Sequence, residues 1–149
     1  MDNTKKFADV NQYIVISVGD EQFGIDIKYI DNIVKMQHIT RVPNVASYIK
    51  GIINLRGEVI PVMSLRLKMG MENDVETKAS RIIILRLEQV GMLGVIVDEV
   101  REVLTLEEDD VEKVVSDNKE ERDSFVFAVG KYGESLVSLL DLNSVVAFD

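Results

Sequence analysis

Turn residues divide this chain into about ten apolar runs of roughly five or six residues, which is the usual length of a β-strand. In Gln22–Ile27 the apolar residues Phe23, Ile25 and Ile27 alternate with polar residues or glycine, as in a strand with one buried face. The pattern predicts an all-β protein with short helices. Because exposed strand edges promote aggregation, we expect the strands to close into barrels.

A closed barrel of five strands is small, so the strand count predicts two small barrels that share a seam. The polar segment Gly70–Ala79 is the expected junction, which gives approximate halves at 12–69 and 80–146. Terminal segments could cross between these halves. Each half has only about 60–70 residues and would be only marginally stable by itself, so we expect residues 1–149 to form a single domain.

Three short helices are expected between the strands. In Ile27–Val34 the apolar residues are spaced like one helix face, and Asp26 can cap its start. Ser64 and Asp141 can cap two further turns, the first at Leu65–Met69. The expected strands are Gln12–Val18, Gln22–Ile27, His38–Val42, Ile49–Ile53, Val59–Met63, Arg81–Leu87, Met92–Val97, Val100–Leu106, Phe125–Val129 and Leu136–Leu140.

The stretch Tyr48–Leu65 carries the clearest hairpin signal. Two apolar runs, Ile49–Ile53 and Val59–Met63, are joined by the four residues Asn-Leu-Arg-Gly at 54–57. Asn and Gly tolerate the positive φ angles of tight turns, so the stretch predicts strand, turn and strand. Arg56 is then expected at the apex, where its guanidinium has five donors and no need to be buried.

Composition excludes several classes of function. The chain has no cysteine, so disulfides, thiolate metal sites and cysteine nucleophiles are ruled out. The net charge of −9 is concentrated in Glu107–Asp123, which carries a net −6, and no basic field exists for nucleic acid. No apolar run reaches the roughly 18 residues of a membrane span, and residues 1–10 lack a signal-peptide pattern. We expect a cytoplasmic protein without direct membrane insertion.

Residues suited to catalysis are scarce. His38 is the only histidine and has no local metal-ligand spacing, which favours a structural role. The acidic run Glu107–Asp110 lacks the ligand order and glycine of a calcium loop, so a solvated, mobile loop is expected there, within a longer acidic loop at Glu107–Asp123. Core filling is favoured over a binding surface for the methionines, which include Met92. Protein binding without catalysis, metal or cofactor is therefore predicted.

The hairpin residues resemble the signature of the CheW family of bacterial chemotaxis coupling proteins. Further similar segments extend the resemblance over about residues 12–146. The residues that carry it are Ile49, Gly51, Asn54, Leu55, Arg56, Gly57, Pro61, Val62 and Leu65, with the segments Gly24–Ile27, Ile39–Pro43 and Gly94–Val103. The resemblance implies two five-stranded SH3-like barrels packed around a shared hydrophobic core, and no catalysis or cofactor.

The resemblance also implies partners. Such an adaptor couples the cytoplasmic tip of transmembrane chemoreceptors to the regulatory domain of the histidine kinase CheA, in arrays at the inner face of the membrane. A receptor helix would lie in an apolar groove between the barrels, and a separate barrel end rich in Val and Ile would meet the kinase. The receptor-binding positions would be Ile30, Asn32, Gly51, Arg56 and Gly57, whereas Asn54, Leu55 and Pro61 belong to the turn and motif.

Each of these positions has a competing interpretation. Asn32 departs from the family, which often has an acidic residue there. The neighbouring Asp31 could supply the charge instead, but on a helix its side chain would point about 100° away from that of Asn32. Ile30 could be the core face of its helix, the two glycines could serve only the backbone, and Arg56 could pair with its own barrel. Two other functions also remain open: an adaptor of the same fold in another chemosensory pathway, and a small-ligand-binding or enzymatic barrel.

Overall fold

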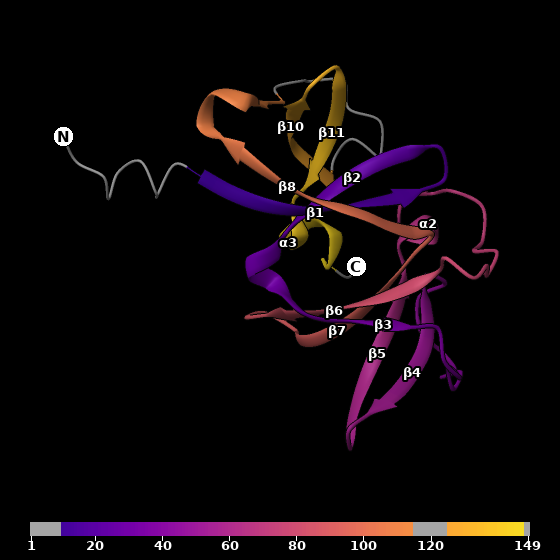
Figure 1. Cartoon of the computed structure of the whole chain (residues 1–149). Coiled ribbons are helices and arrows are strands. Elements are labelled where there is room, and N and C mark those ends of the chain that lie inside the picture. Colours follow the sequence, from indigo (N-terminus) through magenta and orange to yellow (C-terminus); the bar gives the residue numbers. More distant parts are fainter. Residues whose placement is uncertain (1–9, 115–124, 148–149) are drawn as a thin grey trace.

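The computed structural model describes residues 10–114 and 125–147, whose strands form two curved sheets, one above the other in Figure 1. The first sheet has the strand order β8-β1-β2-β11-β10-β9, and the second has the order β3-β6-β7-β5-β4. The strands of the first sheet are β1 (Val10–Val18), β2 (Glu21–Asp26), β8 (Glu99–Glu107), β9 (Val111–Lys113), β10 (Val126–Tyr132) and β11 (Ser135–Leu140). Those of the second are β3 (Ile30–Lys35), β4 (Ile49–Leu55), β5 (Glu58–Ser64), β6 (Arg81–Leu87) and β7 (Gly91–Val97).

Each sheet forms a small SH3-like barrel, as the sequence predicts. In the first barrel the two terminal strands of the sheet, β8 and β9, are joined by a single 3₁₀ turn, η2 (Glu108–Asp110), so the chain itself links the two edges. The short β9 adds a sixth strand to this barrel. The second barrel has the expected five strands, and the backbone of Thr40 bridges to Ile52 on its edge strand β4.

Most neighbouring strands are antiparallel, but one parallel pair in each sheet joins distant segments. In the first sheet β2 pairs with β11, and in the second β5 pairs with β7. Each sheet therefore takes strands from both sides of the segment Gly70–Ala79. Neither sheet is completed by one half of the sequence, since the pairing partners lie far apart along the chain.

The two barrels share a large apolar core. Phe23 and Ile25 of β2 pack there with Ile83 and Leu85 of β6 and with other buried residues of both sheets. A smaller cluster fills the interior of each barrel. Consecutive residues of β6 and β7 are buried because one face of these strands lines the second barrel and the other faces the first. This two-sided burial explains the continuous apolar runs in the sequence.

Both predicted helix caps after the strands are confirmed. Ser64 Oγ accepts a hydrogen bond from the Leu67 N–H at 3.2 Å, at the start of α2 (Leu65–Lys68). Asp141 Oδ1 accepts one from the Asn143 N–H at 3.1 Å, at the start of α3 (Leu142–Val145). Both helices contribute to the shared core, and α3 lies between the barrels in Figure 1. None of the helices in the described residues has the length and apolar character needed to cross a membrane.

The predicted helix Ile27–Val34 is wrong. Asp26 caps only one 3₁₀ turn, η1 (Ile27–Tyr29), and the chain then continues as strand β3. The edge of β6 supplies a pairing partner, with Ile30 opposite Leu85, and this tertiary pairing overrides the helical spacing.

Two further predictions of local structure need correction. The strand expected at His38–Val42 is reduced to the single bridge at Thr40. Pro43 follows and has no N–H to extend a ladder. The loop expected at Glu107–Asp123 is wrong for its first part, because η2 and β9 are regular and β9 pairs with β10. Residues 115–124 of that prediction lie outside the described residues.

Candidate docking site

The hairpin of β4 and β5 ends in a two-residue turn formed by Arg56 and Gly57. Both residues have positive φ angles, 53° and 85°, which is the geometry of a type I′ turn. The Gly57 N–H donates to Asn54 Oδ1 at 3.1 Å. Positive φ therefore falls on Arg56 rather than on Asn54, whose side chain stabilises the turn from the end of β4. Leu55 packs against the apolar interior of the second barrel.

Arg56 lies at the apex, as predicted, and its side chain is exposed. Among the described residues, no carboxylate lies within ion-pair distance of its guanidinium. The competing interpretation, in which Arg56 forms a salt bridge with its own barrel, therefore gains no support. The guanidinium is available to a partner.

Gly51 has a structural role. It is buried on β4 with a φ of 145°, and a Cβ at this position would collide with the backbone carbonyl of Thr40. The reason is the Thr40–Ile52 bridge, in which two backbone hydrogen bonds of 2.8 Å hold the incoming chain against β4. Only glycine allows this close approach. Gly57, in contrast, has open space where its Cβ would be.

Ile30 and Asn32 lie on β3, the edge strand at the opposite end of the sheet order from β4. A β-bulge between them places Asp31 outside the regular pairing. Because this segment is a strand, the helical geometry expected for Asp31 is wrong, and Asp31 forms a salt bridge of 3.1 Å with Arg86. Asn32 Oδ1 accepts from the Ile33 N–H at 2.8 Å, which engages its side chain locally.

An apolar groove of about 390 Å³ lies on the second barrel. Val45 and Val90 at its edge are exposed, whereas Leu93 in its floor is buried. The residues that line it are Val45, Ala46, Tyr48, Ile49, Pro61, Val90, Met92 and Leu93. Tyr48 and Ile49 pack against the shared core and Leu93 belongs to it. All of these residues belong to strands of the second sheet or to its loops, so the groove does not lie between the barrels as expected, although it borders the shared core.

Ile30 lies in one row of apolar residues with Leu93 and Pro61 of the groove, and the row runs across the strands of the second sheet. It pairs with Leu85 on β6, which pairs with Leu93 on β7. Since Val62 pairs with Gly94 in the parallel β5–β7 ladder, Pro61 lies next to Leu93. Directly paired residues share a face of the sheet, so an apolar row runs across the sheet from Ile30 to Pro61. The row thus contains Ile30, a predicted receptor-binding residue, and Pro61, a residue of the family motif.

An ion pair fixes the link between the barrels beside α2. The Arg66 guanidinium donates to both carboxylate oxygens of Asp98, at 2.9 Å and 2.6 Å, and the Gly19 N–H donates to the same carboxylate at 2.8 Å. Burial opposes ionisation of Asp98, but these hydrogen bonds and the Arg66 charge outweigh it and lower the pKa of Asp98. The hydrogen bonds that Arg66 donates to Asp98, against the effect of burial, raise the pKa of Arg66.

Sequence reasoning missed most of the groove. Met92, which was expected to fill the core, packs against the interior cluster of the second barrel and also lines the groove, whereas Met63 and Met69 are buried. Val45 and Val90 stand in loop-like segments, and the signal that could have found them is an apolar residue within a polar turn. His38 is exposed, and nowhere in residues 10–114 and 125–147 do three potential metal ligands gather.

Comparison with known proteins agrees with this geometry. The model of the CheW-like domain matches residues 12–148. The chain belongs to the CheW-like domain family. It is 33% identical over 144 residues to the chemotaxis protein CheW of Helicobacter pylori, a match that covers 95% of this chain and 84% of that protein. It is 34% identical to CheW of Bacillus subtilis over 143 residues, which covers 96% of this chain and 91% of that protein.

A solved structure shows the same fold. The crystal structure of the scaffolding protein TtCheW from Thermoanaerobacter tengcongensis superimposes with a TM-score of 0.85 at 31% identity, covering 93% of this chain and 94% of that one. Membership of the CheW-like family makes a chemotaxis coupling adaptor the general function of this chain.

Proposed function

We propose that this chain holds a chemoreceptor and the histidine kinase CheA in one signalling complex in the cytoplasm, without catalysing a reaction itself. The observation that carries the proposal is the apolar groove, which remains open where the shared core of the two barrels reaches the surface. An open apolar groove on a rigid β-barrel protein can bind the apolar stripe of an amphipathic helix.

The receptor side of the proposal is a helix of the receptor's cytoplasmic tip. Pro61, Val90 and Met92 offer apolar contact area in the groove, and Ile30 lies in the same row of the sheet. Arg56 at the hairpin apex would pair with an acidic side chain of the receptor. Gly51 and Gly57 support this surface through the backbone, since one allows the Thr40 bridge and the other completes the turn.

The kinase side requires a second surface, because one rigid body must hold both partners at the same time. The CheA regulatory domain has the fold of this chain, according to the family resemblance, so we place this contact at a barrel end, away from the groove. Each contact can be weak, since an array of many receptors and kinases raises the effective concentration.

The decisive experiment is reconstitution from purified parts. An immobilised receptor cytoplasmic fragment should retain CheA only when this chain is added. Retention of the chain without CheA would contradict the coupling function. Binding only to receptors of another chemosensory system would assign the same fold to that pathway instead.

Arg56→Ala tests the receptor surface. We expect the affinity for the receptor fragment to fall roughly fivefold or more, as for an interfacial arginine. The unfolding midpoint should not change, because Arg56 has no ion pair with its own barrel in the described residues. Arg101→Ala, which truncates an exposed arginine on β8 of the other barrel, is the control. Equal affinity losses in the two variants would argue against a specific contact.

A further inference from the structure

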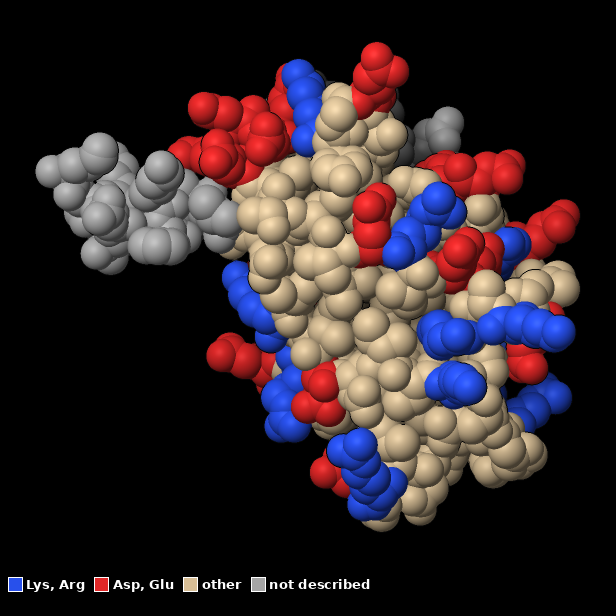
Figure 2. Space-filling view, viewed as in Figure 1, with Lys and Arg blue, Asp and Glu red and all other residues tan. Residues whose placement is uncertain are grey.

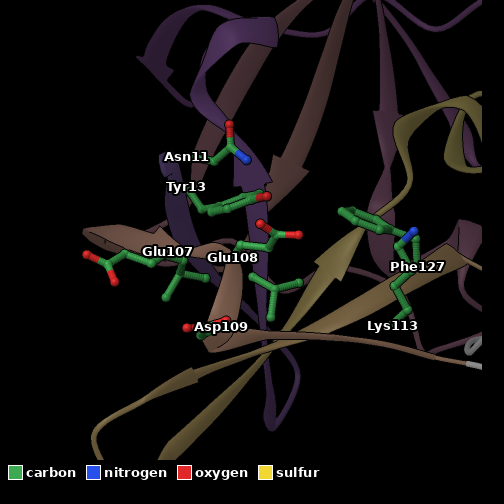
Figure 3. Close-up of a pocket in the computed structure, with 9 residues that line it drawn as sticks. Asn11, Tyr13, Glu107, Glu108, Asp109, Lys113 and Phe127 are labelled. Carbon is green, nitrogen blue, oxygen red and sulfur yellow. The ribbon is translucent and has the colours of Figure 1, made fainter. Parts of the chain in front are cut away.

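One wall of the apolar groove is not part of the sheet. Pro61 and Leu93 stand on strands, but Val45, Ala46 and Tyr48 belong to the segment that leads into β4. A hollow of about 610 Å³ at one end of the first barrel differs in this respect, because its lining residues stand on β1, β8, η2, β9 and β10 (Figure 3). The irregular wall of the groove therefore depends on contacts other than strand pairing.

The backbone of Tyr48 is held at the start of α2. The Tyr48 carbonyl accepts a hydrogen bond of 2.7 Å from the Ser64 N–H, and Ser64 Oγ caps α2. Lys68 stands one helical turn after Ser64, at the end of the same helix. The Nζ atom of Lys68 lies over the Tyr48 ring, 4.2 Å from the ring centroid. Ser64 thus anchors both the ring-bearing segment and the helix that carries Lys68.

Lys68 is unusual because it is buried. Figure 2 shows Lys and Arg side chains that project from the surface of the molecule, whereas Lys68 is only 8% exposed. Burial of an ammonium group is costly unless the protein replaces its contacts with water. Lys68 Nζ donates to the Ala147 carbonyl at 2.7 Å, and it lies 6.0 Å from the centroid of the Phe125 ring in addition to its contact with Tyr48. These groups offset the loss of water, since aromatic faces attract cations.

The contacts of Lys68 join three separate parts of the chain. Ala147 follows α3, Tyr48 leads into β4, and Phe125 leads into β10. Phe125 belongs to the shared core, and Tyr48 packs against that core while it also lines the groove. A methionine has a similar unbranched side chain and would fill the same space without a charge, so packing alone does not require a lysine here. The ammonium group adds a directed contact between a fixed carbonyl and the ring.

We propose that Lys68, held by the Ala147 carbonyl, is a positioning residue that fixes the Tyr48 ring as one wall of the groove. An ammonium group over the ring holds the side chain in one rotamer, so the wall is already formed when a helix binds and less entropy is lost. Lys68 is thus a buried residue that acts on the binding surface. This inference rests on the proposed function for the occupant of the groove, but its first test needs no partner.

NMR of the full chain without a partner is the first test. In the wild-type protein, the Hα–Hβ couplings of Tyr48 should indicate one χ1 rotamer, and the aromatic rings should shift the ε-protons of Lys68 upfield of those of exposed lysines. Lys68→Met should change the Tyr48 couplings toward rotamer averaging. Lys131→Met, at an exposed position on β10, is the control and should leave them unchanged. Averaged couplings in the wild type, or a single Tyr48 rotamer in Lys68→Met, would overturn the proposal.

Binding to the receptor cytoplasmic fragment is the second test. Lys68→Met should weaken binding roughly threefold, as expected when one more side chain must be ordered on binding, whereas Lys131→Met should bind like the wild type. Normal affinity of Lys68→Met would overturn the proposal. If the wild type itself does not bind the fragment, the proposed function fails, and the Tyr48 couplings still decide whether Lys68 positions the wall.

A double-mutant cycle separates positioning of the ring from general loosening of the core. Tyr48→Leu keeps an apolar side chain in the wall but removes the aromatic face that Lys68 contacts. In this background Lys68→Met should no longer weaken binding of the receptor fragment, because the group through which Lys68 acts is absent. An equal threefold loss in both backgrounds would mean that Lys68 acts through the core as a whole, which would refute a positioning role.

Discussion

Apolar residues of the second barrel differ in whether they are buried in the shared core or exposed at the groove. Ile83 and Leu85 of β6 are fully buried in the shared core, whereas Pro61 of β5 is exposed at the groove, as is Val90 in the turn between β6 and β7. The side chains are similar in chemistry, so hydrophobicity alone does not separate core from docking surface. The extent of the first barrel decides which part is covered, and the uncovered part is available to a partner.

This comparison also assigns different roles to the residues of the hairpin. Gly51 serves the close approach of Thr40 to β4, and Arg56 extends into solvent from the turn. Substitutions in the covered region should therefore change stability, whereas substitutions in the uncovered region should change binding. The four predictions below test this separation, in order of decreasing effect on stability.

Leu85→Ala should produce the largest loss of stability. Leu85 is fully buried in the shared core, and a large-to-small change at such a site costs about 4 kcal/mol from lost burial and the cavity that remains. Urea unfolding followed by circular dichroism measures the change. Val59→Ala, on the same sheet but 63% exposed, is the control and should cost less than about 0.5 kcal/mol. Similar losses would contradict the division into covered and uncovered parts.

Gly51→Ala should destabilise the protein by about 3 kcal/mol. The new methyl group would collide with the Thr40 carbonyl, and alanine rarely adopts the positive φ of this position. The same unfolding assay applies. In Gly57→Asn, where the space is open and asparagine tolerates the turn, we expect a small effect. A folded, stable Gly51→Ala protein that has lost only receptor binding would make Gly51 a contact residue after all.

Asp98→Asn should cost about 1.5 kcal/mol near neutral pH, because it removes a paired, partly buried carboxylate beside Arg66. The folded pKa of Asp98 is lowered, so the charged form stabilises the fold above the unfolded pKa. This contribution is lost as the pH falls through the folded pKa. Urea unfolding from pH 7 down to pH 2 should show the two proteins converging at the acid end. A constant difference over this range would exclude the charge as the cause.

Val90→Asp should have the smallest effect on stability, because the side chain is already 37% exposed. Its effect on binding should be large, since an unpaired carboxylate in an apolar groove must be desolvated when a helix binds. Affinity for the receptor fragment, measured by calorimetry, should fall at least tenfold. Val75→Asp, at a position that is 74% exposed and outside the groove, is the control. If both variants bind normally, the groove is not the receptor surface.

Local signals in the sequence were sufficient for much of the fold. Where turn and cap residues act on their immediate neighbours, prediction and structure agree, as at the Arg56–Gly57 turn and at the caps Ser64 and Asp141. The runs Arg81–Leu87 and Gly91–Val97 also form strands as predicted, apart from one residue at an end. These features depend on contacts within a few residues, which the sequence specifies directly.

Prediction failed where a distant strand supplied the missing partner. The spacing in Ile27–Val34 allowed a helix, but pairing with β6 extended the chain from Ile30 onward. The acidic run near Glu108 was expected to be a loop, but it closes the first barrel because β10 pairs with β9. For the candidate site, the sequence placed Arg56 at the apex of the hairpin between β4 and β5. Val45 and Val90, which line the groove, gave no strong signal in the sequence.

The sequence by itself determined the turns, the caps and the apolar runs, because short-range sterics and hydrogen bonding select them. Only the tertiary structure decided which runs became neighbours, since the parallel pairs β2–β11 and β5–β7 join segments far apart in the chain. It also decided which apolar side chains stayed uncovered. Burial depends on the position of the whole first barrel, and no single segment encodes that position.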